Sequence, residues 1–358
     1  MSSMPDRPVT GGVDTHRDQH VAVVVDEVGR VLGTESFSVN SKGYAALHRW
    51  MTSFGHLERV GVEGTGSYGA GLARHLACAG VEVLEVVRPN RQVRRRRGKS
   101  DPTDAEAAAR AVLSGEASGT PKSKDGKVEA LRALQVARRG AIKARTQAAN
   151  QLRDLAISAP AGLRARLEGL STEARVETAA SWRPGPLTDP TEATRTAMRS
   201  VARRHQELTA EIGRLEAAIA ELVASAAPEG LLDKCGVGPD TATKLLVAAG
   251  DNPGRLASEA SFAALCGTSP VDASSGKQVR HRLNRGGDRQ ANSALWRIVM
   301  TRMLYDPRTQ TYVKRRTAEG KTTKEIVRCL KRYVAREVYK SLVASVATSR
   351  TAPSAVAA

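Results

Sequence analysis

The alternation of apolar and polar positions in the N-terminal third of the chain predicts a mixed α/β domain. The predicted strands cover residues 12–15, 21–25, 31–39, 59–63 and 81–87. The predicted helices cover about 41–54 and 68–79, and a third helix begins at Asp101, where Pro102 suits a first helical turn. The resulting order of elements is βββαβαβα.

The middle of the chain has the longer apolar period of helices. A Gly/Ser/Pro/Lys-rich break at 114–126 precedes a basic helix at 127–156. After the proline-containing stretch 182–190, a second long helix carries a heptad seam. Two arrangements are open, because this seam can pack against the basic helix of the same chain or pair two protomers. The seam consists of Leu208, Ile212, Leu215, Ile219 and Leu222.

A third, mainly helical unit begins at about residue 231. Its opening run, Gly236-Val237-Gly238-Pro239, has the glycine spacing of a helix-hairpin-helix turn that meets a DNA phosphate, although a plain helix-linking turn also fits. The final helix, at about 324–346, has one apolar stripe among basic residues, which fits either a solvated amphipathic helix or nucleic-acid contact. The small and polar residues 347–358 predict a disordered tail.

The order βββαβαβα is that of the ribonuclease H-like fold, whose active-site acids come from the first strand, the fourth strand and the last helix. Asp14, Glu63 and the pair Asp101 and Asp104 occupy those three places. Residues three apart share a face of a helix, so the pair can aim at one point. Taken alone, the pair is more typical of acids that complement a helix dipole. With Asp14 and Glu63, it predicts a metal site.

Four carboxylates at a sheet edge form the oxygen-rich kind of site that Mg²⁺ prefers, and Mg²⁺ also bridges phosphate oxygens. Two such ions can clamp the attacking and leaving oxygens of a phosphodiester displacement. Unpaired carboxylates packed together would repel one another, so a metal also accounts for their proximity. Phosphodiester chemistry dependent on Mg²⁺ is therefore the expected activity.

Charge points to the same class of partner. The 358-residue chain has a formal net charge of +18, and such an excess indicates a polyanion such as nucleic acid. No apolar run is long enough for a membrane span, and the N-terminus does not resemble a signal peptide. The four cysteines, Cys78, Cys235, Cys266 and Cys329, lack the spacing of a zinc site or a disulfide framework. We expect a reducing, cytoplasmic compartment.

Two further stretches combine cations with small residues, as phosphate-binding loops do. The arginines just before Asp101 are expected to contact phosphate at the mouth of the acidic site. The second stretch is a Ser-Ser-Gly loop followed by basic residues. The cations of the two stretches are Arg94, Arg95, Arg96, Arg97 and Lys99, and then Lys277, Arg280, Arg282 and Arg285.

Both ends of the chain resemble the DEDD transposases of the insertion-sequence one-hundred-and-ten family. The N-terminal motifs are Gly12-Val13-Asp14-Thr15-His16, Val62-Glu63-Gly64-Thr65-Gly66-Ser67-Tyr68-Gly69, Arg88-Pro89-Asn90 and Gly98-Lys99-Ser100-Asp101-Pro102-Thr103-Asp104-Ala105. The C-terminal motifs are Gly236-Val237-Gly238-Pro239, Leu265-Cys266-Gly267-Thr268-Ser269-Pro270 and Ser274-Ser275-Gly276-Lys277. One departure is Asn284-Arg285-Gly286-Gly287-Asp288-Arg289, where the family usually has a more basic run, so basic contacts there are expected to be shifted or fewer.

The resemblance implies a recombinase with a RuvC-like DEDD domain that binds Mg²⁺ and a separate domain that supplies a serine nucleophile, which becomes covalently joined to DNA. It also implies direction by a structured noncoding bridge RNA that pairs with donor and target DNA. Action as a homo-oligomer, a dimer or a tetramer, is implied as well, with the acids of one protomer joined to the serine domain of another. The implied location is the bacterial cytoplasm, at the nucleoid.

Matched motif by motif, Asp14, Glu63, Asp101 and Asp104 correspond to the metal-binding acids, and Ser275 to the nucleophile. Ser274 is the alternative nucleophile, because the two serines are adjacent. The expected domains are a RuvC-like domain at 8–118, a helical linker with a coiled coil at 126–228 and a serine-bearing domain at 229–346. Two other functions stay open: a metal-dependent nuclease or resolvase without serine chemistry, and a non-catalytic nucleic-acid-binding protein.

Overall fold

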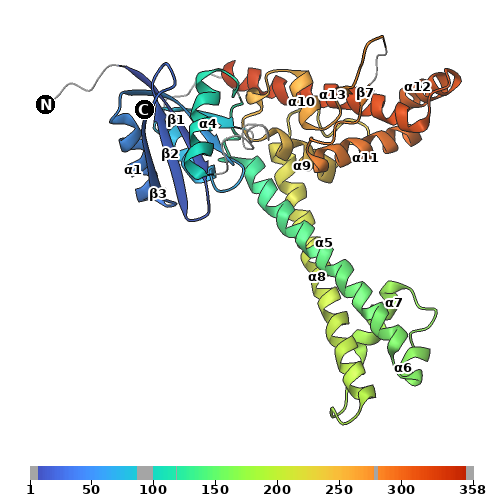
Figure 1. Ribbon diagram of the computed structural model, residues 1–358. Helices are drawn as coiled ribbons and strands as arrows, with labels where there is room; N and C mark the ends of the chain where they lie inside the picture. The colour runs from blue at the N-terminus through green and yellow to red at the C-terminus, as the bar shows by residue number, and fades with distance from the viewer. Residues whose placement is uncertain (1–6, 87–99, 118, 278–280, 352–358) are drawn as a thin grey trace, which may run out of the picture. The chain divides into compact units, whose positions relative to one another are not determined.

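The computed structural model describes residues 7–86, 100–117, 119–277 and 281–351, with side chains up to residue 344. The chain divides into two compact units, residues 1–123 and 124–358. The N-terminal unit contains a five-stranded sheet, and the C-terminal unit is mainly helical (Figure 1). The fold class expected from the sequence, a ribonuclease H-like mixed sheet followed by helical regions, is confirmed. The three-domain division stays a prediction.

The sheet has the strand order β3-β2-β1-β4-β5. The first three strands form an antiparallel meander, and β4 and β5 then add in parallel beside β1. Each run of apolar residues in the sequence corresponds to one of these strands, so the predicted element order is correct. Their bounds are β1 (Pro8–Thr15), β2 (Gln19–Val25), β3 (Val31–Ser38), β4 (His56–Glu63) and β5 (Glu82–Val86).

Helices cover both faces of this sheet. On one face, α1 (Ser41–Thr52) and α2 (Ala70–Cys78) pack with Leu47 and Leu72 against β-strand residues such as Val13. On the other face, α4 (Asp101–Leu113) packs Ala105 and Ala109 against β2 and Ala108 and Val112 against β5. Small alanines on α4 let its axis lie close to the strands.

Two glycines under α4 decide how close it lies. An added Cβ at Gly12 of β1 would stand 2.2 Å from the Ala105 carbonyl oxygen. An added Cβ at Gly61 of β4 would stand 2.8 Å from the Ala108 carbonyl oxygen. These two glycines are paired across the parallel strands β1 and β4. Because they have no side chains, the α4 backbone can rest on the sheet at these two positions, which we call the glycine seat. This seat fixes where the N-terminal end of α4 lies on the sheet.

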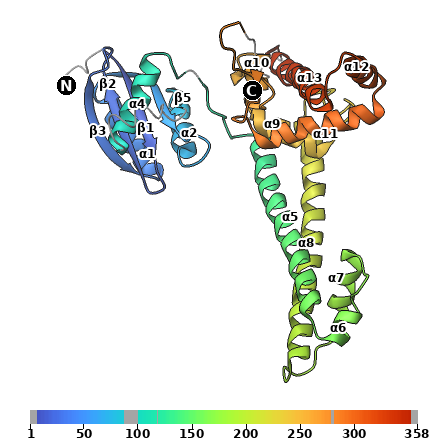
Figure 2. The same ribbon diagram turned by 45° about the vertical axis from the view of Figure 1, so that its right-hand side comes forward.

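The C-terminal unit opens with a long helical hairpin. Its two arms, α5 (Lys127–Ser158) and α8 (Pro190–Ala226), lie side by side in both views, with α6 (Ala161–Ala165) and α7 (Thr172–Ser181) at the tip (Figures 1 and 2). Near the foot of the hairpin, Leu131 packs in one core with Ile219, and near the tip Leu152 packs in another with Met198. The heptad seam of α8 thus packs against α5 of the same chain, the first of the two arrangements left open by the sequence.

The remaining elements build one helical core around Phe262 and Leu295. The apolar stripe of the last helix is buried in that core, as an amphipathic helix requires. This helix extends to Thr351, into the stretch from Ala347 for which disorder was expected, and residues 352–358 lie outside the described residues. The elements are α9 (Pro239–Ala249), η1 (Pro253–Arg255), α10 (Glu259–Leu265), β6 (Val271–Asp272), β7 (His281–Arg282), α11 (Arg289–Tyr305), α12 (Pro307–Ala318) and α13 (Thr323–Thr351).

Within the described residues, no helix combines the length and the apolar character needed to cross a lipid bilayer.

Candidate active site

Asp14 and Glu63 lie at the ends of adjacent parallel strands. The last paired residues are Val13 and Val62, one position before the two acids. The Thr15 hydroxyl donates a hydrogen bond of 2.8 Å to the Glu63 carbonyl oxygen, which ties the two strand ends together. Because side chains alternate along a strand, Asp14 shares its face with Gly12, and Glu63 shares its face with Gly61. Both acids therefore lie on the face that α4 covers.

The N-terminus of α4 brings the other two acids to the same edge. Asp101 is the first residue of the helix, Pro102 follows it, and Ser100 occupies the N-cap position in an extended conformation. The Asp104 backbone N–H donates to the Ser100 carbonyl oxygen at 3.0 Å and closes the first turn. Asp104 is only 5% exposed, whereas the Asp101 side chain is half exposed. The predicted pair thus has one buried and one open carboxylate.

A histidine joins these acids. His16 Nε2 lies 3.1 Å from Asp14 Oδ2 and 3.3 Å from Asp101 Oδ1. Ligand atoms of Asp14, His16 and Asp101 all lie within 4.8 Å of one another. Burial raises the pKa of Asp14, the charges of Asp104 and Asp101 raise it further, and contact with His16 opposes the shift. Burial and the neighbouring acids therefore disfavour the charged form of Asp14.

The four predicted acids do not all join this cluster. Ligand atoms of Asp14 and Asp101 lie within 4.8 Å of one another, and Asp104 acts on Asp14 through its charge. Glu63 lies on the neighbouring strand but outside the group of three ligand atoms. The four-acid metal set stays a prediction. The sequence analysis did not predict that His16 contacts these acids. Its position, two residues after Asp14 and four after Gly12, continues the alternation of one strand face just beyond β1 and indicated this contact.

The donor atoms of this cluster fit a divalent metal ion. Carboxylate oxygens are the ligands that Mg²⁺ and similar hard cations prefer, and the imidazole nitrogen is acceptable to several other divalent ions. A cation would offset the burial and, after it, the carboxylate repulsion that together raise the pKa of Asp14. The chemistry of the donor set thus agrees with a metal centre.

The predicted serine loop lies in the C-terminal unit, between the short paired strands β6 and β7. The Ser274 backbone N–H donates to Asp272 Oδ1 at 2.8 Å, and hydrogen bonding from the Ser274 side chain holds the pKa of the Asp272 carboxyl below its usual value. Ser275 is exposed, and Gly276 after it has a φ of 56°. The glycine takes the left-handed conformation needed for a tight turn directly behind Ser275.

The glycine turn before α9 already has an acidic side chain in the first turn of the helix. Gly236 has a φ of 80°, and Gly238 is the N-cap of α9. Asp240, in the first helical turn, accepts hydrogen bonds from Lys244 at 2.6 Å and from Arg138 at 3.2 Å. This carboxylate already complements the helix dipole. Phosphate contact at Gly236 and Gly238 stays a prediction.

The structure describes only some of the cations that were predicted to bind phosphate. Lys277, Arg282 and Arg285 are exposed on or near the serine loop. The run from Arg94 to Arg97, together with Lys99 and Arg280, lies outside the described residues.

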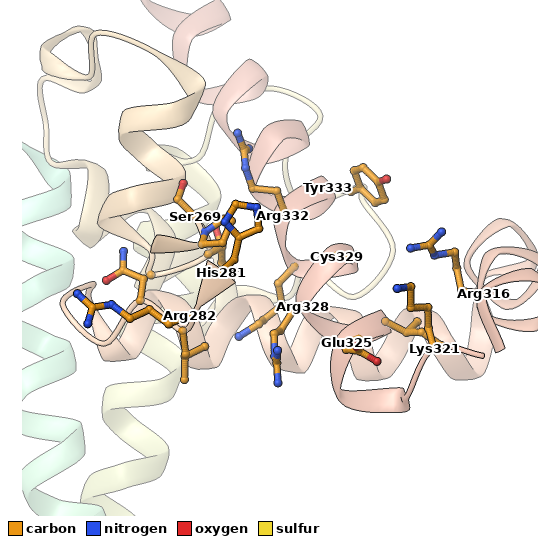
Figure 3. Close-up of a pocket in the computed structure, with 17 residues that line it drawn as sticks. Ser269, His281, Arg282, Arg316, Lys321, Glu325, Arg328, Cys329, Arg332 and Tyr333 are labelled. Carbon is orange, nitrogen blue, oxygen red and sulfur yellow. The ribbon is translucent and has the colours of Figure 1, made fainter. Parts of the chain in front are cut away.

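A basic cavity of about 380 Å³ was not foreseen from the sequence. It lies between β7, the segment before β6, and helices α12 and α13 (Figure 3). Arg282 of β7 lines one side, and Arg316 and Lys321 line the other. Its lining draws on segments from Gly267 to Tyr333, which no local motif connects.

Comparison with known proteins matched two segments of the chain. Residues 11–156 match a family model described as "Transposase", the DEDD transposase domain of IS110, and residues 230–314 match one described as "Transposase IS116/IS110/IS902 family". A relative from Streptomyces coelicolor, the "Insertion element IS110 uncharacterized 43.6 kDa protein", is 38% identical over 88 residues. That match covers 24% of this chain and 22% of the relative. With both domain models matched in order, the chain belongs to the IS110 family of transposases.

Proposed function

We propose that the protein is the transposase of an insertion sequence and that it cleaves and joins DNA strands. The observation that carries the proposal is the meeting of Asp14 and Asp101, from β1 and the start of α4, at one edge of a ribonuclease H-like sheet. Both matched models are transposase models, and the second includes the serine loop. In this proposal the acids of the N-terminal unit bind the metal ion, and the serine of the C-terminal unit attacks the DNA phosphate.

The DEDD family implies a divalent metal ion, and the acidic edge is where its ligands converge. We propose Mg²⁺, held by Asp14, Glu63, Asp101 and Asp104. When bound, Mg²⁺ neutralises phosphate charge and stabilises oxygens in a phosphodiester displacement. The chain's own contribution is to hold the acids in place: the seat of Gly12 and Gly61 positions α4, and His16 spaces Asp14 from Asp101.

In the proposed reaction, Ser275 Oγ forms an ester with the phosphorus of one DNA phosphodiester. The bond from that phosphorus to one deoxyribose oxygen breaks, the released sugar hydroxyl takes up a proton, and Ser275 loses its own. Later attack by a sugar hydroxyl of another strand reverses this exchange and frees the serine. Ser275 is favoured over Ser274 because the Ser274 side chain is already engaged with Asp272. Ser275 is exposed and directly precedes the tight turn at Gly276, so a large substrate can reach its hydroxyl.

The proposed partners follow from charge and family. The net charge of +18 supports binding of donor DNA, target DNA and a structured guide RNA, whose base pairing would select sequence while the protein holds backbone. We further propose a homo-oligomer in which the acids of one protomer and the serine of another act on the same DNA strand.

Trapping of the covalent intermediate tests the proposal. The purified protein, its guide RNA and labelled DNA are incubated with Mg²⁺, denatured, and separated by electrophoresis. We expect wild type and Ser274→Ala to show a labelled protein–DNA band and Ser275→Ala to show none. Cleavage without any adduct in wild type would favour a nuclease or resolvase that uses water. An adduct in Ser275→Ala would show that another residue is the nucleophile.

A further inference from the structure

Among the described residues of the C-terminal unit, Lys331 of α13 is the one charged side chain that is buried. It is 9% exposed, and it lines the basic cavity beside the serine loop. Burial lowers its pKa, and the charge of Arg328 lowers it further. Burying an ammonium group is costly unless an anion or strong hydrogen-bond acceptors replace its water. Among the described residues, no carboxylate oxygen lies within 4.0 Å of the Lys331 ammonium nitrogen, the distance that defines an ion pair.

A single neutral acceptor orients the ammonium group. Lys331 Nζ donates to Asn292 Oδ1 at 2.9 Å. The Asn292 amide is itself fixed, because Nδ2 donates to the carbonyl oxygens of Cys266 at 2.8 Å and Gly267 at 3.2 Å. Its oxygen can therefore point only toward Lys331. An ammonium group has three donors, so this arrangement presents a buried cation whose charge is not neutralised by its partner.

The cavity wall adds cations of two kinds. Arg316 pairs with Glu319, and Arg332 pairs with Glu259, so both are already engaged. Arg282 and Arg328 are exposed, and neither forms an ion pair within the part of the chain that the structure describes. The one acid in the lining, Glu325, accepts hydrogen bonds of 2.8 Å from the backbone and hydroxyl of Thr322. Arg282, Arg328 and Lys331 thus bring positive charge to one wall of the cavity, and Glu325 offsets part of it through its charge interaction with Arg328.

The cavity and its cations lie beside the two strands that hold the Ser275 loop. Arg282 belongs to β7, one of the two strands that hold the Ser275 loop, and Pro270 at the cavity wall directly precedes β6. A DNA strand whose phosphodiester lies at Ser275 must pass neighbouring phosphates along these strands. Arg282 and Arg328 line the cavity from β7 and α13, two segments far apart in the sequence (Figure 3). The cavity thus places positive charge beside the strands that hold the loop.

We propose that Arg282, Arg328 and Lys331 bind one phosphodiester of the DNA strand that Ser275 attacks, close to but distinct from the attacked phosphate. This inference rests on the proposed function for the identity of the strand, although binding itself needs neither the metal nor the serine. The site is a positioning site: it holds the strand beside the loop. Asn292, which lines a neighbouring cavity together with Lys331, holds the Lys331 ammonium group where the two cavities meet.

Binding without catalysis tests the inference. The full chain is titrated with fluorescently labelled single-stranded DNA of mixed sequence, in EDTA, at several salt concentrations. We expect Lys331→Met to weaken binding about tenfold or more, the loss of one charge-assisted hydrogen bond. The slope of log affinity against log salt should fall by about 0.7, the value for one phosphate contact on a single strand. Lys340→Met, an exposed lysine of the same helix that does not line the cavity, should leave both unchanged.

Further variants separate binding from folding. Arg282→Gln and Arg328→Gln change exposed side chains, so they should lower affinity and slope while the thermal unfolding midpoint stays at the wild-type value. If all three variants bind DNA as Lys340→Met does, the site is wrong. An RNA strand of the same sequence forms a second arm, and a larger loss for RNA than for DNA would overturn the assignment to DNA.

Different results would contradict the phosphate site and the serine reaction. Ser275→Ala should bind the DNA strand as wild type does, because the cavity does not include this residue. Absence of a covalent adduct in wild type would remove the serine reaction, whereas a wild-type salt slope in Lys331→Met would remove the phosphate site alone.

Discussion

At the scale of single residues, the acidic site depends on two positions that have no side chain. Gly12 and Gly61 let α4 lie against the sheet, and the acids two positions further along each strand then face its N-terminal end. A larger residue in either glycine position would move the helix together with Asp101 and Asp104. The geometry of the carboxylates is therefore set by packing beneath the helix.

Gly12→Ala should destabilise the N-terminal unit by about 1–3 kcal/mol, because the new methyl group would overlap backbone atoms of α4 that cannot move aside cheaply. Urea unfolding followed by circular dichroism measures the loss. Gly66→Ala is the matched control, since no atom lies within 4 Å of an added Cβ there. Equal stability of the two variants would contradict the seat described for α4.

The carboxylate pair on α4 gives a second residue-scale prediction. Asp101→Ala combined with Asp104→Ala should abolish strand transfer in Mg²⁺, because two of the four proposed ligands are removed. Guide-RNA binding, measured by gel shift, should stay within a few-fold of wild type, since neither carboxylate is placed as an RNA contact. Full recombination by the double variant would refute the metal-site assignment.

At the scale of elements, Asp240 joins α9 to the hairpin. Its carboxylate accepts hydrogen bonds from Lys244 of α9 and from Arg138 of α5, and Arg138 also donates to Glu216 of α8 at 3.0 Å. Burial alone would raise the pKa of Asp240, but the hydrogen bond and charge of Lys244, together with Gln135 and Arg138, lower it below its ordinary value of 3.8. Three helices are thus held by one charged network.

Asp240→Asn should lower the free energy of unfolding by about 1 kcal/mol at neutral pH, a value reduced for the partial exposure of the pair. Because the folded-state pKa of Asp240 lies below the unfolded value of 3.8, its contribution is present above that pH and is lost as pH falls through the folded pKa. Urea melts should therefore differ at pH 7 and converge in strong acid. A constant difference at every pH would point to altered packing instead.

At the scale of the whole molecule, the sequence was most informative where structure is local. Strand and helix periods predicted the order of elements in the N-terminal unit, and strand ends then located Asp14 and Glu63. The basic cavity could not be predicted in this way. Lys331 meets Asn292 across 39 residues, and Asn292 meets Cys266 across 26, so only tertiary packing brings them together. The pairing of the heptad seam was likewise undecidable from its period alone.

The net charge gives a prediction for the complete chain. With +18 formal charges, DNA binding should be dominated by release of counterions, and affinity should fall steeply and linearly on a logarithmic plot against salt concentration. Fluorescence anisotropy between roughly 50 and 200 mM salt should reveal a loss of about a thousandfold if six or more phosphates are neutralised. A flat dependence would mean that these cations do not face the DNA.

The lengths of α5 and α8 set how far the hairpin extends. Its arms contain 32 and 37 residues, and at about 1.5 Å per residue they reach about 50 Å from foot to tip. That reach equals about fifteen base pairs of duplex at about 3.4 Å each. Since the seam repeats every heptad, removing matched heptads from both arms would shorten the reach in fixed steps while keeping the packing. The reach of the hairpin therefore follows from the number of helical turns in its two arms.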